Sequence, residues 1–153
     1  MPWLVPSSPA PESDRELNRL LGGLAERLDD PAEDRDRTVR ELLAELLYAR
    51  PYDQLAASAP WAAFSLDPRN VTFEAEHYVV TDRERFARVK PLLWAWYMGD
   101  RTPFGLSMRS GIPFRRLLAE RIFARTGEDL KIFPHVEVSV GYNIEAGDGV
   151  VLH

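Results

Sequence analysis

Apolar and polar positions follow a helical period in two segments near the N-terminus. Five leucines between residues 17 and 28 share one helical face, and they follow a capping-box pair at Ser13 and Glu16. A second apolar stripe runs from about residue 34 to residue 50 and ends before Pro51, which cannot continue a helix. Because a short acidic turn joins the two segments, the pattern predicts an αα-hairpin.

The same period predicts two further helices in the second half of the chain. Asp82 is placed to cap a helix over residues 83–97, which is interrupted or begun again at Pro91. A later helix is expected over residues 113–125, where a proline occupies the first turn and Gly127 follows as the stop.

Two segments carry no clear period. Residues 1–12 hold four of the 12 prolines and predict a disordered tail. Residues 71–80 (VTFEAEHYVV) favour either a strand or an extended arm, and the pattern does not decide between them.

After residue 127 the spacing of apolar positions changes from helical to six residues. The repeated aliphatic positions are Val138, Val140, Ile144, Ala146, Val150 and Leu152. A period of six is typical of a parallel β-helix, in which short strands turn three corners in each coil. An antiparallel hairpin stays open as an alternative, because Asp148-Gly149 is a strong turn signal. We therefore expect a helical region over residues 13–127 and the start of a β-helix over residues 128–153.

The composition of the chain limits which partners, metal sites and cellular locations are expected for this protein. The net charge of −5 gives no reason to expect nucleic acid or an acidic membrane surface as a partner. No cysteine and only three histidines are present, so no metal site is expected. The first residues lack the basic and apolar regions of a signal peptide, and no apolar run is long enough to span a bilayer. These features predict a cytoplasmic protein.

The C-terminal segment resembles the entry into the left-handed β-helix of hexapeptide-repeat acyltransferases. The residues that carry the likeness are Gly141-Tyr142-Asn143-Ile144-Glu145-Ala146-Gly147, a G-x-N-I-x-x-G signature. The likeness is greatest to the branch that contains maltose and galactoside O-acetyltransferases, and it extends more loosely upstream to about residue 67. It implies a fold class that is mainly α in the N-terminal region and continues into the first coil of a left-handed parallel β-helix.

The resemblance also implies an activity. Members of this family transfer an acyl group from acetyl-CoA or another acyl-CoA to a hydroxyl or amine of a small-molecule acceptor such as a sugar. They form homotrimers, with each active site between neighbouring β-helices. A histidine acts as the general base, while an asparagine and backbone amides stabilise the oxyanion.

Few of the family's functional residues can be carried over to this chain. The resemblance makes Tyr142 and Asn143 the candidate substrate-binding residues. Tyr142 takes the place of a small residue that faces the acceptor in the sugar acetyltransferases. Asn143 belongs to the same signature, where its commoner role is structural, because asparagine tolerates the left-handed corner conformation. His153 is the candidate catalytic base, although it occupies a corner place in the repeat, as His135 does one coil side earlier. The phase of the repeat places the family's asparagine about two residues beyond His153 and its histidine several coils further. We therefore interpret the chain as a truncated, N-terminal portion of such an enzyme that is inactive alone and binds acyl-CoA poorly.

The leucine-rich helix pair supports a different class of function as the alternative. In this interpretation the chain is a non-enzymatic helical module for interaction or oligomerisation, and its short C-terminal strands form a contact between copies.

Overall fold

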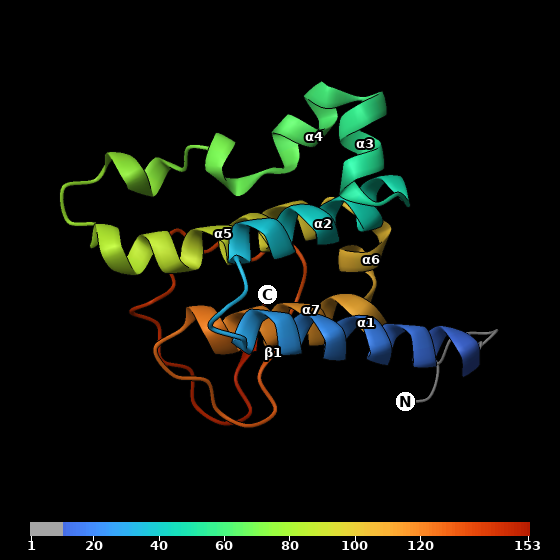
Figure 1. The fold of residues 1–153 in the computed structure, drawn as a ribbon. Helices are drawn as coiled ribbons and strands as arrows, with labels where there is room; N and C mark the ends of the chain where they lie inside the picture. Colours follow the sequence, from blue (N-terminus) through green and yellow to red (C-terminus); the bar gives the residue numbers. More distant parts are fainter. Residues whose placement is uncertain (1–10) are drawn as a thin grey trace.

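The computed structural model describes residues 11–153, which form a mainly helical fold with one two-stranded sheet (Figure 1). The α-helices in chain order are α1 (Pro11–Asp29), α2 (Arg35–Tyr48), α3 (Tyr52–Ser58), α4 (Pro60–Leu66), α5 (Arg83–Gly99), α6 (Pro103–Leu106) and α7 (Met108–Ile122). Two 3₁₀ turns, η2 (Pro68–Asn70) and η3 (Glu74–His77), precede α5, and the strands are β1 (Lys131–Ile132) and β2 (Val151–Leu152).

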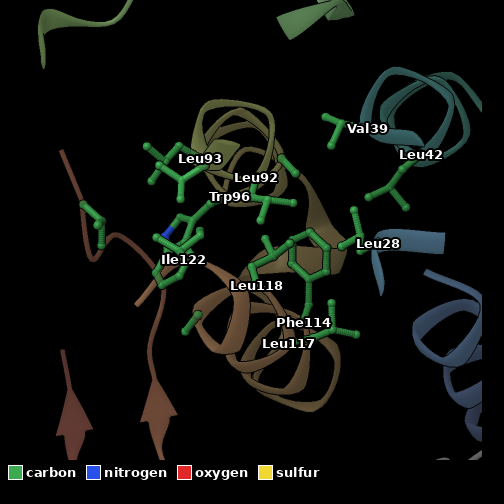
Figure 2. Packing of buried hydrophobic residues seen from close by; sticks show 14 of the residues in the cluster. Leu28, Val39, Leu42, Leu92, Leu93, Trp96, Phe114, Leu117, Leu118 and Ile122 are labelled. Carbon is green, nitrogen blue, oxygen red and sulfur yellow. The ribbon is translucent and has the colours of Figure 1, made fainter. Parts of the chain in front are cut away.

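Helix α5 lies at the centre of the hydrophobic core (Figure 2). It packs against α2 on one side and against α7 on another, while α1 packs against both α2 and α7. Fully or almost fully buried side chains fill the space between these helices, among them Leu28, Val39, Leu43, Leu92, Leu93, Trp96, Phe114, Leu118 and Ile122. The predicted apolar stripes thus face a common interior, as expected for amphipathic helices.

The predicted cap at Asp82 is confirmed, and the structure adds a second capping aspartate, Asp34, at the predicted start of the second helix. The carboxylates of Asp34 and Asp82 accept hydrogen bonds from backbone N–H groups in the first turns of α2 and α5. Helix α5 runs through Pro91 without interruption, which answers the question that the sequence left open. The first helix starts earlier than predicted, because α1 begins at Pro11 and Ser13 lies in its first turn. The rest of the predicted disordered tail, residues 1–10, lies outside the described residues.

The predicted limits of the last helix were wrong. Helix α7 begins at Met108 and contains Pro113, so the helix starts five residues before the predicted proline. Its early part is stabilised by close packing on α6, since a Cβ atom at Gly111 would lie 1.9 Å from the Gly105 carbonyl oxygen. The helix ends at Ile122, before the predicted residue 125, because the N–H groups of Ala124 and Arg125 donate to the Ile144 carbonyl instead of to the preceding helical turn.

Residues 71–80 form no strand. They run extended into η3 and then make a turn before α5. Phe73 anchors the segment, because its ring packs edge-on against Phe86, Trp94 and Tyr97.

The C-terminal region contains two stacked segments, residues 124–133 and 144–152, that run parallel. Lys131 pairs with Val151 in the sheet, and an isolated parallel bridge joins Arg125 to Glu145. Backbone hydrogen bonds of 2.8 to 3.3 Å connect the segments along their length, from Ala124 to Phe133. The parallel direction overturns the hairpin alternative, and the pairing starts near residue 124 rather than at the predicted boundary of 128. The sheet itself is only two residues long in each strand.

Five of the six repeated aliphatic positions are buried or half-buried against the core. Val138 and Ala146 are buried, and Val140, Val150 and Leu152 pack half-buried against the core. Ile144 is more exposed than its phase predicts, at 37%.

Candidate functional site

The G-x-N-I-x-x-G signature forms a corner that rests on the start of α5. Gly141 has a φ of +69°, and a Cβ atom there would lie 2.2 Å from the Ile122 side chain, so only glycine fits this turn. Tyr142 follows with its side chain buried, and its hydroxyl oxygen accepts a hydrogen bond of 3.0 Å from the Asp82 backbone N–H.

Arg85 holds the two candidate substrate-binding residues together. Its guanidinium lies 4.4 Å from the centre of the Tyr142 ring and donates to the Tyr142 carbonyl. It also donates to the Asn143 side-chain oxygen at 3.1 Å. The structure therefore brings Tyr142 and Asn143 together through Arg85 of α5.

His153, the candidate base, is exposed and lies apart from this corner. Its imidazole packs edge-on against the Phe133 ring, with 6.3 Å between the ring centres. Within residues 11–153 it has no hydrogen bond to a carboxylate that would orient the ring. His135 also takes a corner place, with a φ of +68°, and its backbone N–H donates to Asp100 at 2.9 Å.

A buried ion pair beneath β1 escaped the sequence interpretation. Arg115 of α7 is fully buried and pairs with Asp100 at the end of α5. The same guanidinium donates to the carbonyls of Ile132 at 2.7 Å and Gly105 at 2.8 Å. One side chain thus joins α5, α6, α7 and β1. The sequence did contain a sign that Arg115 is buried. It lies four residues after Gly111 and three before Leu118, a spacing that places it on the buried face of α7.

A cavity of about 260 Å³ opens beside this ion pair. It is lined by Trp96, Tyr97, Asp100, Arg101, His135, Val136 and Glu137. Burial raises the pKa of the Tyr97 phenol, and the charge of Glu137, which accepts its hydrogen bond, raises it further. The Arg101 guanidinium lies 5.0 Å from the centre of the Tyr97 ring. His135, Tyr97 and Glu137 therefore line the same cavity.

A larger concave surface, the α1–α2 groove, has a volume of about 980 Å³. Its apolar floor includes Leu17, Leu20, Leu42 and Phe104, and it continues past Gly23 to the starts of α3 and α7. Ion pairs between helices frame it, because Arg27 donates to Glu41 at 2.7 Å and Arg109 donates to Asp14 at 2.7 Å. The volume lies at the upper end of the range for small-molecule pockets, and the lining mixes apolar and charged side chains.

The described residues offer no group of three or more acidic or histidine side chains arranged for a metal ion. None of the helices in this part of the chain is long and apolar enough to cross a membrane.

Comparison with known proteins finds no relative of this chain. No protein-family model, no curated protein and no solved structure matches the chain.

Proposed function

We propose that this chain supplies the N-terminal part of a hexapeptide-repeat acyltransferase. Its helices cap the first coil of a left-handed parallel β-helix, and the assembly is a homotrimer. The reaction is transfer of an acyl group from acetyl-CoA or another acyl-CoA to a hydroxyl or amine of a small-molecule acceptor such as a sugar. A cytoplasmic location belongs to the same proposal.

The observation that carries the proposal is the spacing of the parallel pairs. The bridge between Arg125 and Glu145 and the pair of Lys131 with Val151 lie six residues apart on both segments. Each pair joins residues twenty positions apart, as does the hydrogen bond from the Glu128 N–H to the Asp148 carboxylate. Parallel pairing that recurs after six residues supports stacked coils of a hexapeptide repeat, and the offset of twenty exceeds by two the roughly eighteen residues of three regular hexads.

The helices support the role of a cap. A stack of repeats needs an end unit that covers its first edge and satisfies the backbone groups there. Arg115 donates to the Ile132 carbonyl of β1 from within the helical core, and α7 packs against β1. Trp96 likewise donates to the Val136 carbonyl at 2.9 Å. These contacts fasten the first stacked segment, and the loop that follows it, to the helices.

The chemistry of such an enzyme needs a base for the acceptor proton and donors for the oxyanion. Tyr142 and Asn143 are the acceptor-binding candidates within this chain. The basic run at the start of α5 consists of Arg83, Arg85, Arg88 and Lys90. It is a poor fit for the phosphates of coenzyme A, because three of these four side chains already have partners. Arg85 holds the signature corner, Arg88 pairs with Glu84, and Lys90 pairs with Glu76.

The test has two parts. First, the 153-residue chain is assayed for release of free coenzyme A from acetyl-CoA with a panel of sugars and amines. We expect no turnover above a control without protein, and turnover would contradict our placement of the catalytic groups beyond His153. Second, the coding sequence after codon 153 is read. In-phase hexads containing an asparagine and a histidine are expected, and a downstream frame without hexads would refute the acyltransferase proposal.

A helical interaction module is the second candidate function. The α1–α2 groove favours it, because this concave apolar surface is built entirely from helices and their connections. Sedimentation of the chain separates the two candidates: a well-folded monomer or dimer favours the module, whereas aggregation that a longer chain relieves favours the acyltransferase portion.

A further inference from the structure

The second stacked segment contains a peptide bond that can rearrange without an enzyme. Asp148 is the only aspartate in the chain that is followed by glycine. In an Asp-Gly peptide the glycine nitrogen attacks the aspartate side chain with little steric hindrance, because glycine has no Cβ atom. Both residues are exposed, so burial does not shield them. Whether the reaction proceeds in the folded chain therefore depends on the hydrogen bonds of these two residues.

The rearrangement passes through a five-membered cyclic imide. The Gly149 nitrogen forms a bond to the side-chain carboxyl carbon of Asp148, and the amide proton leaves with the carboxyl hydroxyl group as water. Water then opens the ring at one of its two carbonyls. Opening at the former side-chain carbonyl restores aspartate, whereas opening at the former main-chain carbonyl gives isoaspartate, in which the chain runs through the side chain. The net change is an isomerisation that needs no oxidant, reductant or co-reactant other than water.

Glu128 of the first stacked segment holds both reacting groups. Its backbone N–H donates to the Asp148 carboxylate at 2.8 Å, and its carbonyl accepts a hydrogen bond from the Gly149 N–H, also at 2.8 Å. The preceding Gly127 packs so closely that an added Cβ atom would lie 2.4 Å from the Asp148 nitrogen. Ring closure removes the Gly149 proton and turns the carboxyl group toward the Gly149 nitrogen, so both hydrogen bonds must break first. The two segments therefore have to separate locally before the reaction.

We propose that Asp148 is a site of isoaspartate formation that the stacking of the two segments keeps unreacted. The backbone of Glu128 clamps both reacting groups, and isomerisation proceeds only when this corner is open. The proposal rests on the stacking of residues 124–133 and 144–152 and does not depend on acyl transfer.

Formation of isoaspartate makes the opening permanent. The isoaspartyl link adds one methylene carbon to the main chain before Gly149 and leaves a carboxylate attached beside it. The Gly149 N–H then no longer lies opposite the Glu128 carbonyl, and the register of β2 against β1 changes with it. Because each strand is only two residues long, little pairing is present to restore the register. Isomerisation at Asp148 thus converts a transient opening into a lasting loss of stacking.

The experiment measures isoaspartate in the full chain during incubation at neutral pH. Transfer of a labelled methyl group by an isoaspartyl methyltransferase counts the modified residues, and electron-transfer fragmentation assigns them to Asp148. Each rate is measured for the folded chain and for the same chain in concentrated urea. Gly127→Ala opens the corner, and Gly147→Ala is its matched control, because a Cβ atom at Gly147 would meet no atom within 4 Å. Asp148→Glu removes the reactive side chain.

We expect wild type to isomerise at least about tenfold more slowly when folded than in urea, because two hydrogen bonds must break. Gly147→Ala should keep this ratio of rates, whereas in Gly127→Ala the ratio should fall at least about threefold. Asp148→Glu should give no signal at this position. Equal rates for folded and unfolded wild type, no isoaspartate at Asp148 in urea, or equal ratios for the two glycine variants would overturn the proposal.

Wild type alone provides a second test that does not require any variant to fold. The Gly149 amide hydrogen exchanges with solvent when the same clamp opens, so its exchange should be slowed by the same factor as isomerisation, within about threefold. A protected Asp148 beside a freely exchanging Gly149 amide would contradict the clamp. None of these measurements involves an acyl donor, so failure of the acyltransferase proposal leaves this one untouched.

Discussion

The stacking of the two C-terminal segments depends on a glycine at one corner. An ideal Cβ atom at Gly127 would lie 2.2 Å from the Gly147 carbonyl carbon and 2.4 Å from the Asp148 nitrogen. Both neighbours are backbone atoms, so no side-chain rotation relieves the overlap in Gly127→Ala. At Gly147, on the facing corner, an added Cβ would meet no atom within 4 Å. Gly147→Ala is therefore the matched control.

The expected cost follows from the hydrogen bonds at this corner. To accept the methyl group the corners must move apart, which weakens three bonds: Ala146 N–H to Arg125, Gly149 N–H to Glu128, and Glu128 N–H to the Asp148 carboxylate. At about 1 kcal/mol for each bond, we expect Gly127→Ala to lower the free energy of unfolding by about 2 to 3 kcal/mol. Gly147→Ala should be neutral or stabilising by up to about 1 kcal/mol, because alanine restricts the unfolded chain.

Urea unfolding followed by circular dichroism measures these changes, and amide hydrogen exchange locates them. In Gly127→Ala the amides of Ala146 and Gly149 should lose protection before those of the helical core. Equal stability of the two variants, or loss of protection in α5 alone, would refute the close stacking of the corners.

Two further predictions concern buried charges. Arg115→Met leaves the Asp100 carboxylate buried without its partner and should cost about 3 to 5 kcal/mol in urea unfolding. The neighbouring Arg116→Met removes only a partly exposed pair with Glu120 and should cost less than about 1 kcal/mol, so equal losses would contradict the role of Arg115. Hydrogen bonds from the Arg69 guanidinium hold the pKa of Asp67 well below its ordinary 3.8, so its contribution to stability is present above that pH and is lost as the pH falls further. Asp67→Asn should therefore flatten the acid side of the stability curve, and curves that stay parallel for wild type and variant would contradict this reasoning.

Local signals predicted the starts of two helices and the period of the C-terminal repeat. Asp34 and Asp82 cap α2 and α5 because a carboxylate satisfies free N–H groups within its own turn, an interaction contained in a few adjacent residues. The six-residue spacing likewise predicted a parallel arrangement, and the direction of pairing between β1 and β2 is parallel.

Other features depend on partners distant in the sequence, and local reasoning failed there. Gly127 was interpreted as a helix stop, but its place is set by the backbone of Gly147 twenty residues later. Gly111 allows α7 to start early because it packs on Gly105, a contact that no local pattern contains. Only the structure shows why these positions require glycine.

The candidate site likewise combines residues that a local motif predicts with a partner that is distant in the sequence. The signature pointed to Tyr142 and Asn143, and these residues do form an ordered corner. Their common partner is Arg85, which is 57 residues from Tyr142 and belongs to an alternating run of acidic and basic residues that resembles a solvated helix face. Arg85 stacks on the Tyr142 ring and makes two hydrogen bonds to the corner because the C-terminal segments pack on α5.

Our central claim is that residues 124–133 and 144–152 stack in parallel with a six-residue recurrence. The most direct test is nuclear magnetic resonance detection of couplings through the backbone hydrogen bonds. We predict couplings from the Ala146 nitrogen to the Arg125 carbonyl, from the Lys131 nitrogen to the Val150 carbonyl, and from the Phe133 nitrogen to the Leu152 carbonyl. Couplings that instead join residues 136–143 to residues 150–153 in antiparallel order would contradict the claim.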